Sequence, residues 1–310
     1  MKISVIISTY LHERLNDFLE LSESISKQTY KDIEKIVVVD GNYELYAEIK
    51  SHMHSLGNND VKVLYNEKKS GLASSRNAGI KNASGNIVAF IDDDAVAAKD
   101  WIERLVSVYR DSNVIGVGGK ILPLWMSSEP NCLPEELYWI IGATYKGFPE
   151  YMTKVRNLFG SNMSFKREVF EKVGSFDENL GRKGESQLQA EEAEFCIRVS
   201  RRLGKVVYTP EAIVYHKVFS NRTRFGYIIK RAFWQGYSKA LLSSKCKPDV
   251  LMTESSYFKQ LLFRFCPNTL KKFTVKPLRS LKQFLMVTFA VVAVCSGYVY
   301  YFIRNHFEKH

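Results

Sequence analysis

An apolar strand that ends in three adjacent carboxylates constrains this chain more than any other segment. Residues 87–91 (IVAFI) read as a buried strand, and Asp92, Asp93 and Asp94 follow directly. Three like charges at a strand end repel one another and resist desolvation, so the arrangement is costly unless a cation is bound there. Oxygen ligands suit Mg²⁺ or Mn²⁺, which are usually held by one or two carboxylates and by substrate phosphates. The alternative is a solvated acidic turn ahead of a helix that we predict near Lys99.

Four apolar strand candidates alternate with helical stretches in the first hundred residues. They cover residues 3–7, 36–39, 61–65 and 87–91. This order is typical of a mostly parallel sheet, in which ligands bind at the carboxyl ends of the strands. We therefore predict an α/β fold in which the polar residues after three of these strands meet at one rim. Those residues are Ser8 to Tyr10, Asp40 to Asn42, and Asp92 to Asp94. Asp40 can also serve only as a turn former beside Gly41.

Two further segments carry candidate chemistry. Residues 70–79 (SGLASSRNAG) combine small residues, which let a helix start approach a ligand, with the guanidinium of Arg76, which suits phosphate or a base carbonyl. Neither a G-x-x-x-x-G-K loop nor a G-x-G-x-x-G loop occurs in the sequence. Glu191 and Glu192 begin an amphipathic stretch, where acidic residues suit the helix dipole. The functional alternative makes one of them a general base for an attacking alcohol.

The last third of the chain is basic and ends in an apolar helix. Residues 217–282 hold 15 Lys and Arg against two acidic residues, whereas the whole chain has a net charge of +11. Such a block suits nucleic acid or an anionic membrane. Residues 284–303 follow without a single charge, and a helix of that length matches the roughly 30 Å hydrocarbon core of a bilayer. A buried core helix, the alternative, would normally show a polar stripe. We predict a transmembrane helix and no nucleic-acid partner.

The distribution of basic residues also predicts the orientation of that helix. Five basic residues precede it and two follow it, so the large N-terminal part is expected in the cytoplasm. The start of the chain shows no signal-peptide pattern, in agreement with this expectation. Five cysteines without a C-x-x-C pair are predicted to be reduced and structural. Residues 224–247 have the composition of an interfacial amphipathic helix, or of a packing helix with a solvated charged face.

Taken in order, these segments resemble a known family. The motifs match the family 2 glycosyltransferases of GT-A fold in order and spacing over about residues 1–216. They are SVIISTY, VVVDG, SGLASSRNAG, IVAFIDDDA, GSNMSF, VGSFDENL and AEEAEFCIR. The resemblance implies a GT-A, Rossmann-like sheet flanked by helices. It also implies inverting transfer of a sugar from a nucleoside diphosphate donor, usually linked to UDP, with Mg²⁺ or Mn²⁺ as cofactor.

The same resemblance assigns roles to seven residues. Glu192 matches the catalytic base, although the family more often has Asp there, which is one methylene shorter. His216 matches a further metal or diphosphate contact of some members, and it can equally be a histidine at the domain edge. The remaining assignments are nucleotide contacts at Thr9, Asp40 and Arg76, a ribose contact at Asp92, and a metal ligand at Asp94.

Departures from the family pattern limit the kinds of acceptor that we expect. The Q-x-x-R-W motif of processive synthases is absent, which favours addition of a single sugar. The chain is also similar to archaeal transferases that extend dolichyl-phosphate-linked glycans, several of which use uronic acid donors. For a carboxylate on the donor sugar, Arg182 and Lys183 are the candidate cations, and solvated loop charges are the alternative. A transferase of cell-surface polysaccharide with another acceptor, a metal-dependent nucleotidyltransferase and a non-catalytic binding protein are the competing functions.

The predicted organisation has four parts. Residues 1–216 form the catalytic domain, 217–282 a basic juxtamembrane region of helices, 283–303 the transmembrane helix and 304–310 a short tail. The predicted protein is a single-pass membrane enzyme with a cytoplasmic catalytic domain. Its expected partners are a nucleotide-sugar donor, a polyprenyl or dolichyl-phosphate-linked acceptor, and the membrane.

Overall fold

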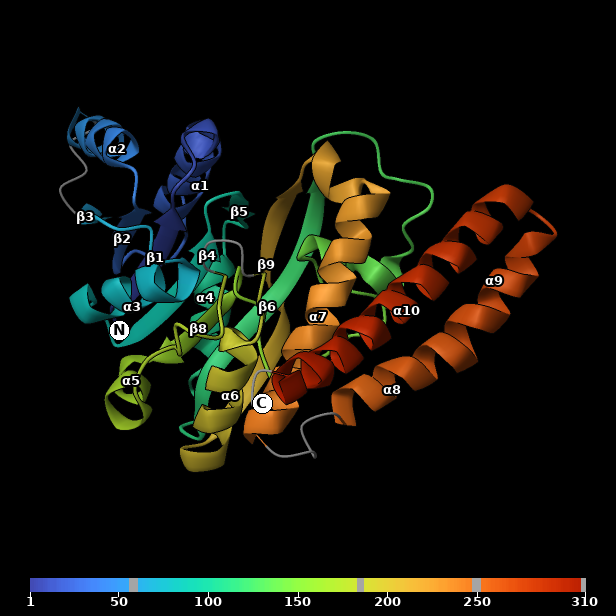
Figure 1. The fold of residues 1–310 in the computed structure, drawn as a ribbon. Coiled ribbons are helices and arrows are strands. Elements are labelled where there is room, and N and C mark those ends of the chain that lie inside the picture. The colour runs from blue at the N-terminus through green and yellow to red at the C-terminus, as the bar shows by residue number, and fades with distance from the viewer. Residues whose placement is uncertain (56–60, 183–186, 247–251, 308–310) are drawn as a thin grey trace. The chain divides into compact units, whose positions relative to one another are not determined.

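The computed structural model describes residues 1–55, 61–182, 187–246 and 252–307. The chain divides into two compact units, which are described separately (Figure 1). The first unit comprises Met1–Leu122, Tyr151–Ser186 and Glu191–His216. The second comprises Pro123–Glu150, Gln187–Ala190 and Lys217–His310.

The first unit is built on a sheet whose parallel half matches the sequence prediction. Strand β1 pairs in parallel with β2 on one side and with β4 on the other, and β2 pairs in parallel with β3. The four strands are β1 (Ile3–Thr9), β2 (Ile33–Asp40), β3 (Val61–Asn66) and β4 (Ile87–Asp92). Their carboxyl ends therefore lie along one edge of the sheet, as expected for a ligand-binding rim.

The other half of the sheet is antiparallel, so the confirmed α/β fold has a mixed sheet. The strand order is β3-β2-β1-β4-β8-β6-β9-β5, with β7 paired to β9. Strand β8 runs antiparallel to β4 and β6, and β9 runs antiparallel to β5 and β7. These strands are β5 (Ala95–Ala97), β6 (Val114–Trp125), β7 (Thr153–Lys154), β8 (Met163–Lys166) and β9 (Lys205–Val218).

Glycines explain why β6 was not predicted. Glycine weakens a strand signal because it brings no side chain to pack, and β6 contains three of them. The structure requires one at position 116, because an added Cβ would lie 2.7 Å from the ring of Phe165 on β8. A Cβ on Gly118 would lie 2.7 Å from the side chain of Leu158. The glycines lower the β-strand propensity of β6, but they let the side chains of Phe165 and Leu158 approach its backbone.

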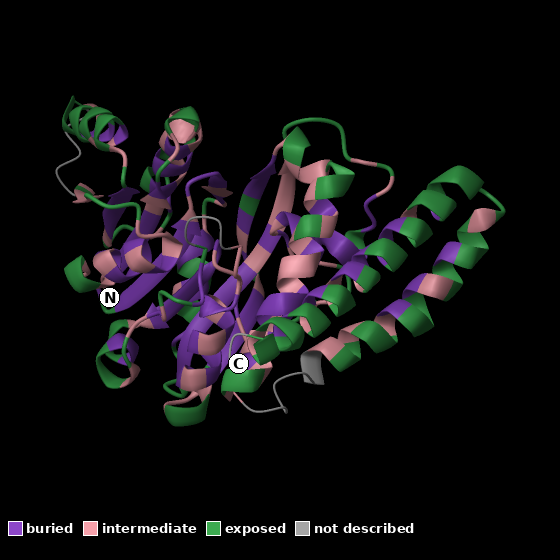
Figure 2. Ribbon diagram, in the orientation of Figure 1, coloured by how far each residue is buried: buried purple, intermediate pink, exposed green. Residues whose placement is uncertain are grey.

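Alternation along the parallel strands produces two hydrophobic cores. Ile3, Val5 and Ile7 face one core, which contains residues of α1, α2 and α4. Ile6 faces the other core, which contains residues of α3, α5 and α6. The buried strands are visible in Figure 2. The helices are α1 (Leu15–Ser26), α2 (Tyr43–Ser55), α3 (Leu72–Asn82), α4 (Trp101–Val108), α5 (Arg167–Val173) and α6 (Glu191–Arg202), with the 3₁₀ turn η1 (His12–Arg14) before α1.

The second unit is mainly helical. Its elements are η2 (Glu135–Ile141), η3 (Ser220–Thr223), α7 (Phe225–Cys246), α8 (Met252–Gln260), the π-helical turn η5 (Leu261–Phe265), α9 (Cys266–Phe273) and α10 (Pro277–Phe307). Within the described residues, α10 is the one helix whose length and composition would let it cross a membrane. It contains the apolar segment predicted from the sequence.

Two glycines let α7 and α10 pack closely. A Cβ on Gly236 of α7 would lie 1.9 Å from the carbonyl oxygen of Val294, and a Cβ on Gly297 of α10 would lie 1.9 Å from that of Phe233. The apolar side of α7 is thus used for packing within this unit, where Ile228 and Ala240 are fully buried. This favours a packing helix over an interfacial one for residues 225–246. Lys247 lies outside the described residues.

Candidate active site

The acidic end of β4 lies beside a histidine of β9. Asp92 ends β4, and Asp94 lies in the turn that leads into β5. The antiparallel register of β5 and β9 pairs Ala95 with His216. This register places the Nε2 atom of His216 3.2 Å from Oδ1 of Asp94. Both side chains are almost completely buried, so the sheet itself fixes their separation.

Asp92, Asp94 and His216 form a group that fits a divalent metal ion. Each residue offers one ligand atom, and the three atoms lie within 4.8 Å of one another. Two carboxylates and an imidazole suit a cation of the Mn²⁺ type better than an anion. Asp92 keeps a third of its side chain exposed, which leaves this side open to a ligand. The three residues named from the sequence for metal and ribose thus lie together.

An arginine that sequence reasoning missed balances the other side of the acidic turn. Arg14, at the end of η1, places its Nη1 atom 2.7 Å from Asp93 and 3.2 Å from Asp94. Thr9 donates a hydrogen bond of 2.7 Å to Asp93 from the end of β1. Burial raises the pKa of Asp93 to about 6, although the charge of Arg14 opposes the shift. Arg14 therefore supplies part of the positive charge that the acidic triplet requires.

Within the structure Thr9 contacts Asp93, and its nucleotide contact stays a prediction. Its hydroxyl is bound to Asp93, so Thr9 organises the acidic turn. The signal for Arg14 was a basic residue in the polar segment just after the first strand, opposite an acidic strand end. That signal is weak, because the two segments are separated by 79 residues in the sequence.

Arg76 connects the candidate metal side of the site to the predicted base. It lies on α3 and is 2% exposed. Its Nη1 atom donates a hydrogen bond of 2.9 Å to Glu192, and its Nη2 atom lies 3.6 Å from Asp92. Glu191 lies 3.8 Å from the same guanidinium. Asp92 and Glu192, from β4 and α6, therefore share one buried cation.

The two adjacent glutamates have opposite electrostatic environments. Burial, and the charge of its neighbour, raise the pKa of Glu191 to about 8. Burial also acts on Glu192, but the charge and hydrogen bond of Arg76 outweigh it and lower the pKa of Glu192. The charge of Arg182 acts to lower the pKa of both glutamates. A group held ionised can accept a proton, so Glu192 is the better suited of the two to act as a base.

Gly160 makes room for the pair formed by Arg76 and Glu192. A Cβ at this position would lie 2.3 Å from Nη2 of Arg76 and 2.3 Å from Oε1 of Glu192. Arg76 is also close to Asp92 and Glu191, so its guanidinium could move aside only by disturbing those ion pairs. The first residue of the GSNMSF motif is thus a glycine for steric reasons.

Asp40 is engaged by the backbone ahead of α3. Its carboxylate accepts hydrogen bonds from the backbone N–H groups of Ser70, at 3.1 Å, and Gly71, at 2.9 Å. Asn66 donates a third, at 3.2 Å. Asp40 therefore fixes the start of the helix that carries Arg76, and a nucleotide contact for it stays a prediction. Arg182 is exposed, and Lys183 lies outside the described residues.

Comparison with known proteins gives a consistent picture. The model of glycosyl transferase family 2 matches residues 4–174. The chain is 40% identical over 303 residues to the glucosyl-dolichyl phosphate glucuronosyltransferase of Haloferax volcanii, covering 97% of this chain and 96% of that protein.

Solved structures show the same fold at low sequence identity. The mannosyltransferase PcManGT from Pyrobaculum calidifontis, in complex with GDP-Man and Mn²⁺, is 16% identical, with a TM-score of 0.62 over 96% of this chain and 87% of that one. S. aureus TarS is 17% identical, with a TM-score of 0.55 over 89% of this chain and 46% of that one. From the family match and the full-length relative, this chain is a glycosyltransferase that belongs to glycosyl transferase family 2.

Proposed function

We propose that this protein is a membrane-bound, inverting glycosyltransferase that moves one sugar from a UDP-sugar to a dolichyl-phosphate-linked acceptor. The observation that carries the proposal is the buried link from Asp92 through Arg76 to Glu192, next to the group of Asp94 and His216. It joins a candidate phosphate-binding side to a candidate base. Similarity to the Haloferax transferase over nearly the whole chain supports the same substrate class.

In this proposal Glu192 removes the proton from the acceptor hydroxyl as the oxygen attacks the anomeric carbon. A carboxylate can do so only if an oxygen atom is free to reach the hydroxyl. One Oε1 contact of Glu192 is to Arg76, and 18% of its side chain is exposed. Glu192 thus keeps part of its surface for an acceptor while Arg76 holds it ionised. Attack opposite the leaving diphosphate inverts the configuration at that carbon.

The donor side is assigned to the rim of the parallel strands. Asp94, His216 and Asp92 would hold a Mg²⁺ or Mn²⁺ ion, which when bound offsets the negative charge that develops on the departing diphosphate. Asp92 would also contact the ribose, and Thr9, Asp40 and Arg76 would contact the nucleotide. In the described structure Thr9 and Asp40 support the acidic turn and the start of α3.

A glucuronic-acid-type donor is proposed from the similarity to the Haloferax transferase and from the positive charge near Glu192. The Haloferax relative is a glucosyl-dolichyl phosphate glucuronosyltransferase. Arg182 is close enough to Glu191 and Glu192 for its charge to lower their pKa values. We infer that Arg182, together with Lys183, recognises the carboxylate of the donor sugar.

Membrane attachment is proposed through α10, with residues 1–216 as the catalytic domain on the cytoplasmic side. The apolar composition of α10 and the excess of basic residues before it support a single pass in this orientation. A dolichyl-linked acceptor would then be held in the leaflet that contains the anchor.

The test uses the full chain in vesicles that contain glucosyl-dolichyl phosphate, with UDP-glucuronic acid and MnCl₂. Wild-type protein is expected to add one sugar to the lipid and to release UDP, as seen by mass spectrometry. Glu192→Gln should lose transfer by on the order of 10²- to 10⁴-fold, because the amide cannot accept the proton. Glu194→Gln is the matched control, since Glu194 pairs with Arg198 on the same helix. Wild-type rates in Glu192→Gln, or release of pyrophosphate, would refute the proposal.

A further inference from the structure

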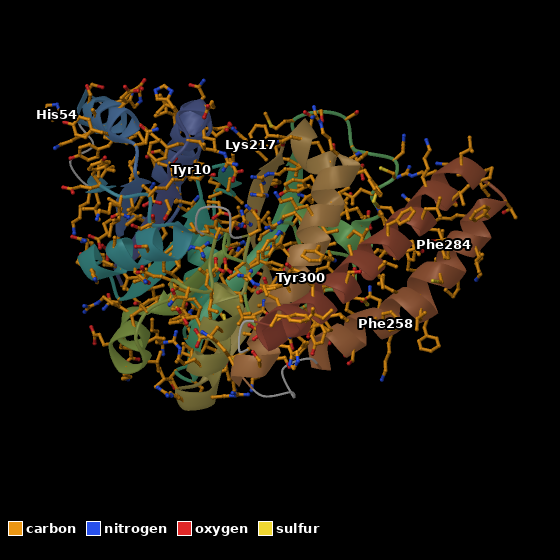
Figure 3. All side chains as sticks on the ribbon, in the orientation of Figure 1. Tyr10, His54, Lys217, Phe258, Phe284 and Tyr300 are labelled. Atoms are coloured by element: carbon orange, nitrogen blue, oxygen red, sulfur yellow. The ribbon has the colours of Figure 1, made fainter. Side chains whose placement is uncertain are left out.

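The helical segment α8–η5–α9 of the second unit exposes large apolar side chains. Phe258 is 48% exposed, Leu262 47%, Phe263 75% and Leu270 64%. Phe258 is labelled in Figure 3. We propose that this segment is a second lipid contact of the protein, lying in the interface of an anionic bilayer beside α10. This inference rests on the membrane attachment proposed above and adds to it a specific apolar face within the basic region of residues 217–282.

The exposed face belongs to a helix whose other face is fixed. The hydroxyl of Tyr257 donates a hydrogen bond to the backbone oxygen of Glu136, at 2.8 Å, and accepts one from Nε1 of Trp139, at 3.0 Å. Gln260 donates to the backbone oxygen of Lys146 at 2.7 Å. These bonds attach α8 to η2 and to the loop after it. The outward side chains therefore cannot turn inward without breaking these hydrogen bonds.

A π-helical turn concentrates the exposed residues. Within η5, Leu261 and Phe265 are each 4% exposed, and the three residues between them all face outward. Pro267 explains the turn, because it lacks the N–H that would bond to the backbone oxygen of residue 263 in a regular α-helix. The wider turn places Leu262, Phe263 and Arg264 together on the outside.

The charges around this face match anionic headgroups. No acidic residue occurs between Ser255 and Phe307, while Lys259, Arg264, Lys271 and Lys272 lie in or next to the exposed face. Basic side chains can place their charge at the headgroups while their methylene stems cover apolar surface. A nucleic acid would also attract the charges, but it would leave the exposed Phe and Leu side chains in water. The combination favours a lipid surface.

The face is continuous with the candidate transmembrane helix. The chain passes from α9 to α10 through residues 274–276, and α9 packs against α10 within this unit. Val275 is 76% exposed and Leu278 73%, and further along α10 Phe284 and Phe289 are also exposed. Apolar exposure thus runs from Phe258 into the anchor without an acidic interruption. By contrast, the residues predicted to form an interfacial helix lie in α7, which packs on α10.

The experiment places p-benzoylphenylalanine at position 263 of the full chain in vesicles of phosphatidylcholine and phosphatidylglycerol, followed by irradiation. This amino acid forms a covalent adduct with the molecule that it touches. Tyr43, an aromatic residue of the first unit with 65% exposure, is the matched control position.

We expect a lipid adduct at position 263 in several-fold excess over position 43. The adduct should fall several-fold when phosphatidylglycerol is omitted or when Lys271 and Lys272 are replaced by Gln, because each lysine near the surface adds to the attraction. A cross-linked dimer at position 263 would show that a second copy covers the face, and no adduct would show that it faces water. Either result overturns the proposal.

Sugar transfer measured in the same vesicles separates the two proposals. A lipid adduct without transfer would support the surface and count against the proposed function. Transfer without a lipid adduct would do the reverse. Position 263 belongs to none of the residues assigned to the active site, so its replacement should leave turnover unchanged.

Discussion

Charged side chains are buried and paired at the acidic rim of the first unit, whereas they are exposed on the basic helices of the second unit. In the first unit, Arg76 and Asp94 are almost completely buried, and their charges are matched by partners at 2.9 to 3.6 Å. In the second unit, Lys271 and Lys272 are exposed in a stretch without acidic residues. A buried charge is stable only beside a correctly placed partner, whereas water solvates an exposed charge at almost any surface position. Substitutions should therefore be severe in the first set and mild in the second.

The largest effect is expected from Asp94→Asn. The amide keeps the shape but removes the negative charge shared by His216 and Arg14. We expect transfer to fall by on the order of 10³-fold, because the leaving group loses its electrostatic partner. Calorimetric titration with MnCl₂ should show weakened binding, independently of turnover.

Asp100→Asn serves as the control for this prediction. Asp100 pairs with Arg104 at the surface, with 40% of its side chain exposed. Turnover and Mn²⁺ binding should stay at wild-type levels. Equal metal binding by wild type and Asp94→Asn would show that this carboxylate is not a ligand.

The next largest effect is expected on folding, from Glu34→Gln. Glu34 of β2 is 3% exposed, and it accepts hydrogen bonds from Ser4 and Ser84 and contacts Lys2 and Lys62. The lysines stay partly exposed, so the cost is that of losing hydrogen bonds to a charged group, about 1.5 to 3 kcal/mol, and urea unfolding of the first unit should shift to lower concentration.

The same residue predicts a pH dependence. Burial works to raise the pKa of Glu34, but its hydrogen bonds outweigh this and hold the pKa well below the ordinary value of 4.5. Its contribution to stability is therefore present above pH 4.5 and is lost as the pH falls toward the lower folded-state pKa. Glu34→Gln should lose less stability than wild type over that acidic range. The exposed pair of Glu23 and Lys27 gives the control, since Glu23→Gln should change neither stability nor its pH profile.

A smaller effect on turnover is expected from Gly160→Ala. The added methyl group would meet the side chains of Arg76 and Glu192, so their hydrogen bond must lengthen or break. We expect transfer to fall roughly 10- to 100-fold, in keeping with the sensitivity of catalysis to small displacements. Gly226→Ala is the control, because a Cβ there meets nothing within 4 Å. An unchanged rate in Gly160→Ala would mean that the pair is not needed for catalysis.

The smallest effect is expected from Lys271→Gln combined with Lys272→Gln. Both side chains are exposed, and surface substitutions of this kind usually change stability by less than about 0.5 kcal/mol. Thermal unfolding in detergent should therefore match wild type. A loss comparable to that of Glu34→Gln would remove the distinction between buried and exposed charge in the two units.

Local patterns in the sequence were sufficient to predict much of the fold. Alternating apolar residues predicted β1 to β4, and the small residues before Arg76 predicted the start of α3. The uncharged run predicted the apolar part of α10. What was missed depends on distant contacts: strand β6 needs a glycine opposite the ring of Phe165, and α8 is held by hydrogen bonds to η2.

The candidate site follows the same rule. Residue type and motif order identified Asp92, Asp94, His216, Arg76 and Glu192, and the structure brings them into one connected cluster. No local pattern indicated that Arg14 would bind the acidic turn, because that contact is set by how β1 and β4 pair. Nor did sequence show that Asp40 would cap the backbone ahead of α3.

Arg76 has a consequence for the protein between reaction cycles. Asp92 of β4 and the ionised Glu192 of α6 contact its guanidinium, and without this internal counter-charge the two carboxylates would repel each other whenever substrate was absent. With the arginine in place, the enzyme without substrate already contains the positive charge that these carboxylates need. Its shape then does not depend on the cell's supply of activated sugar.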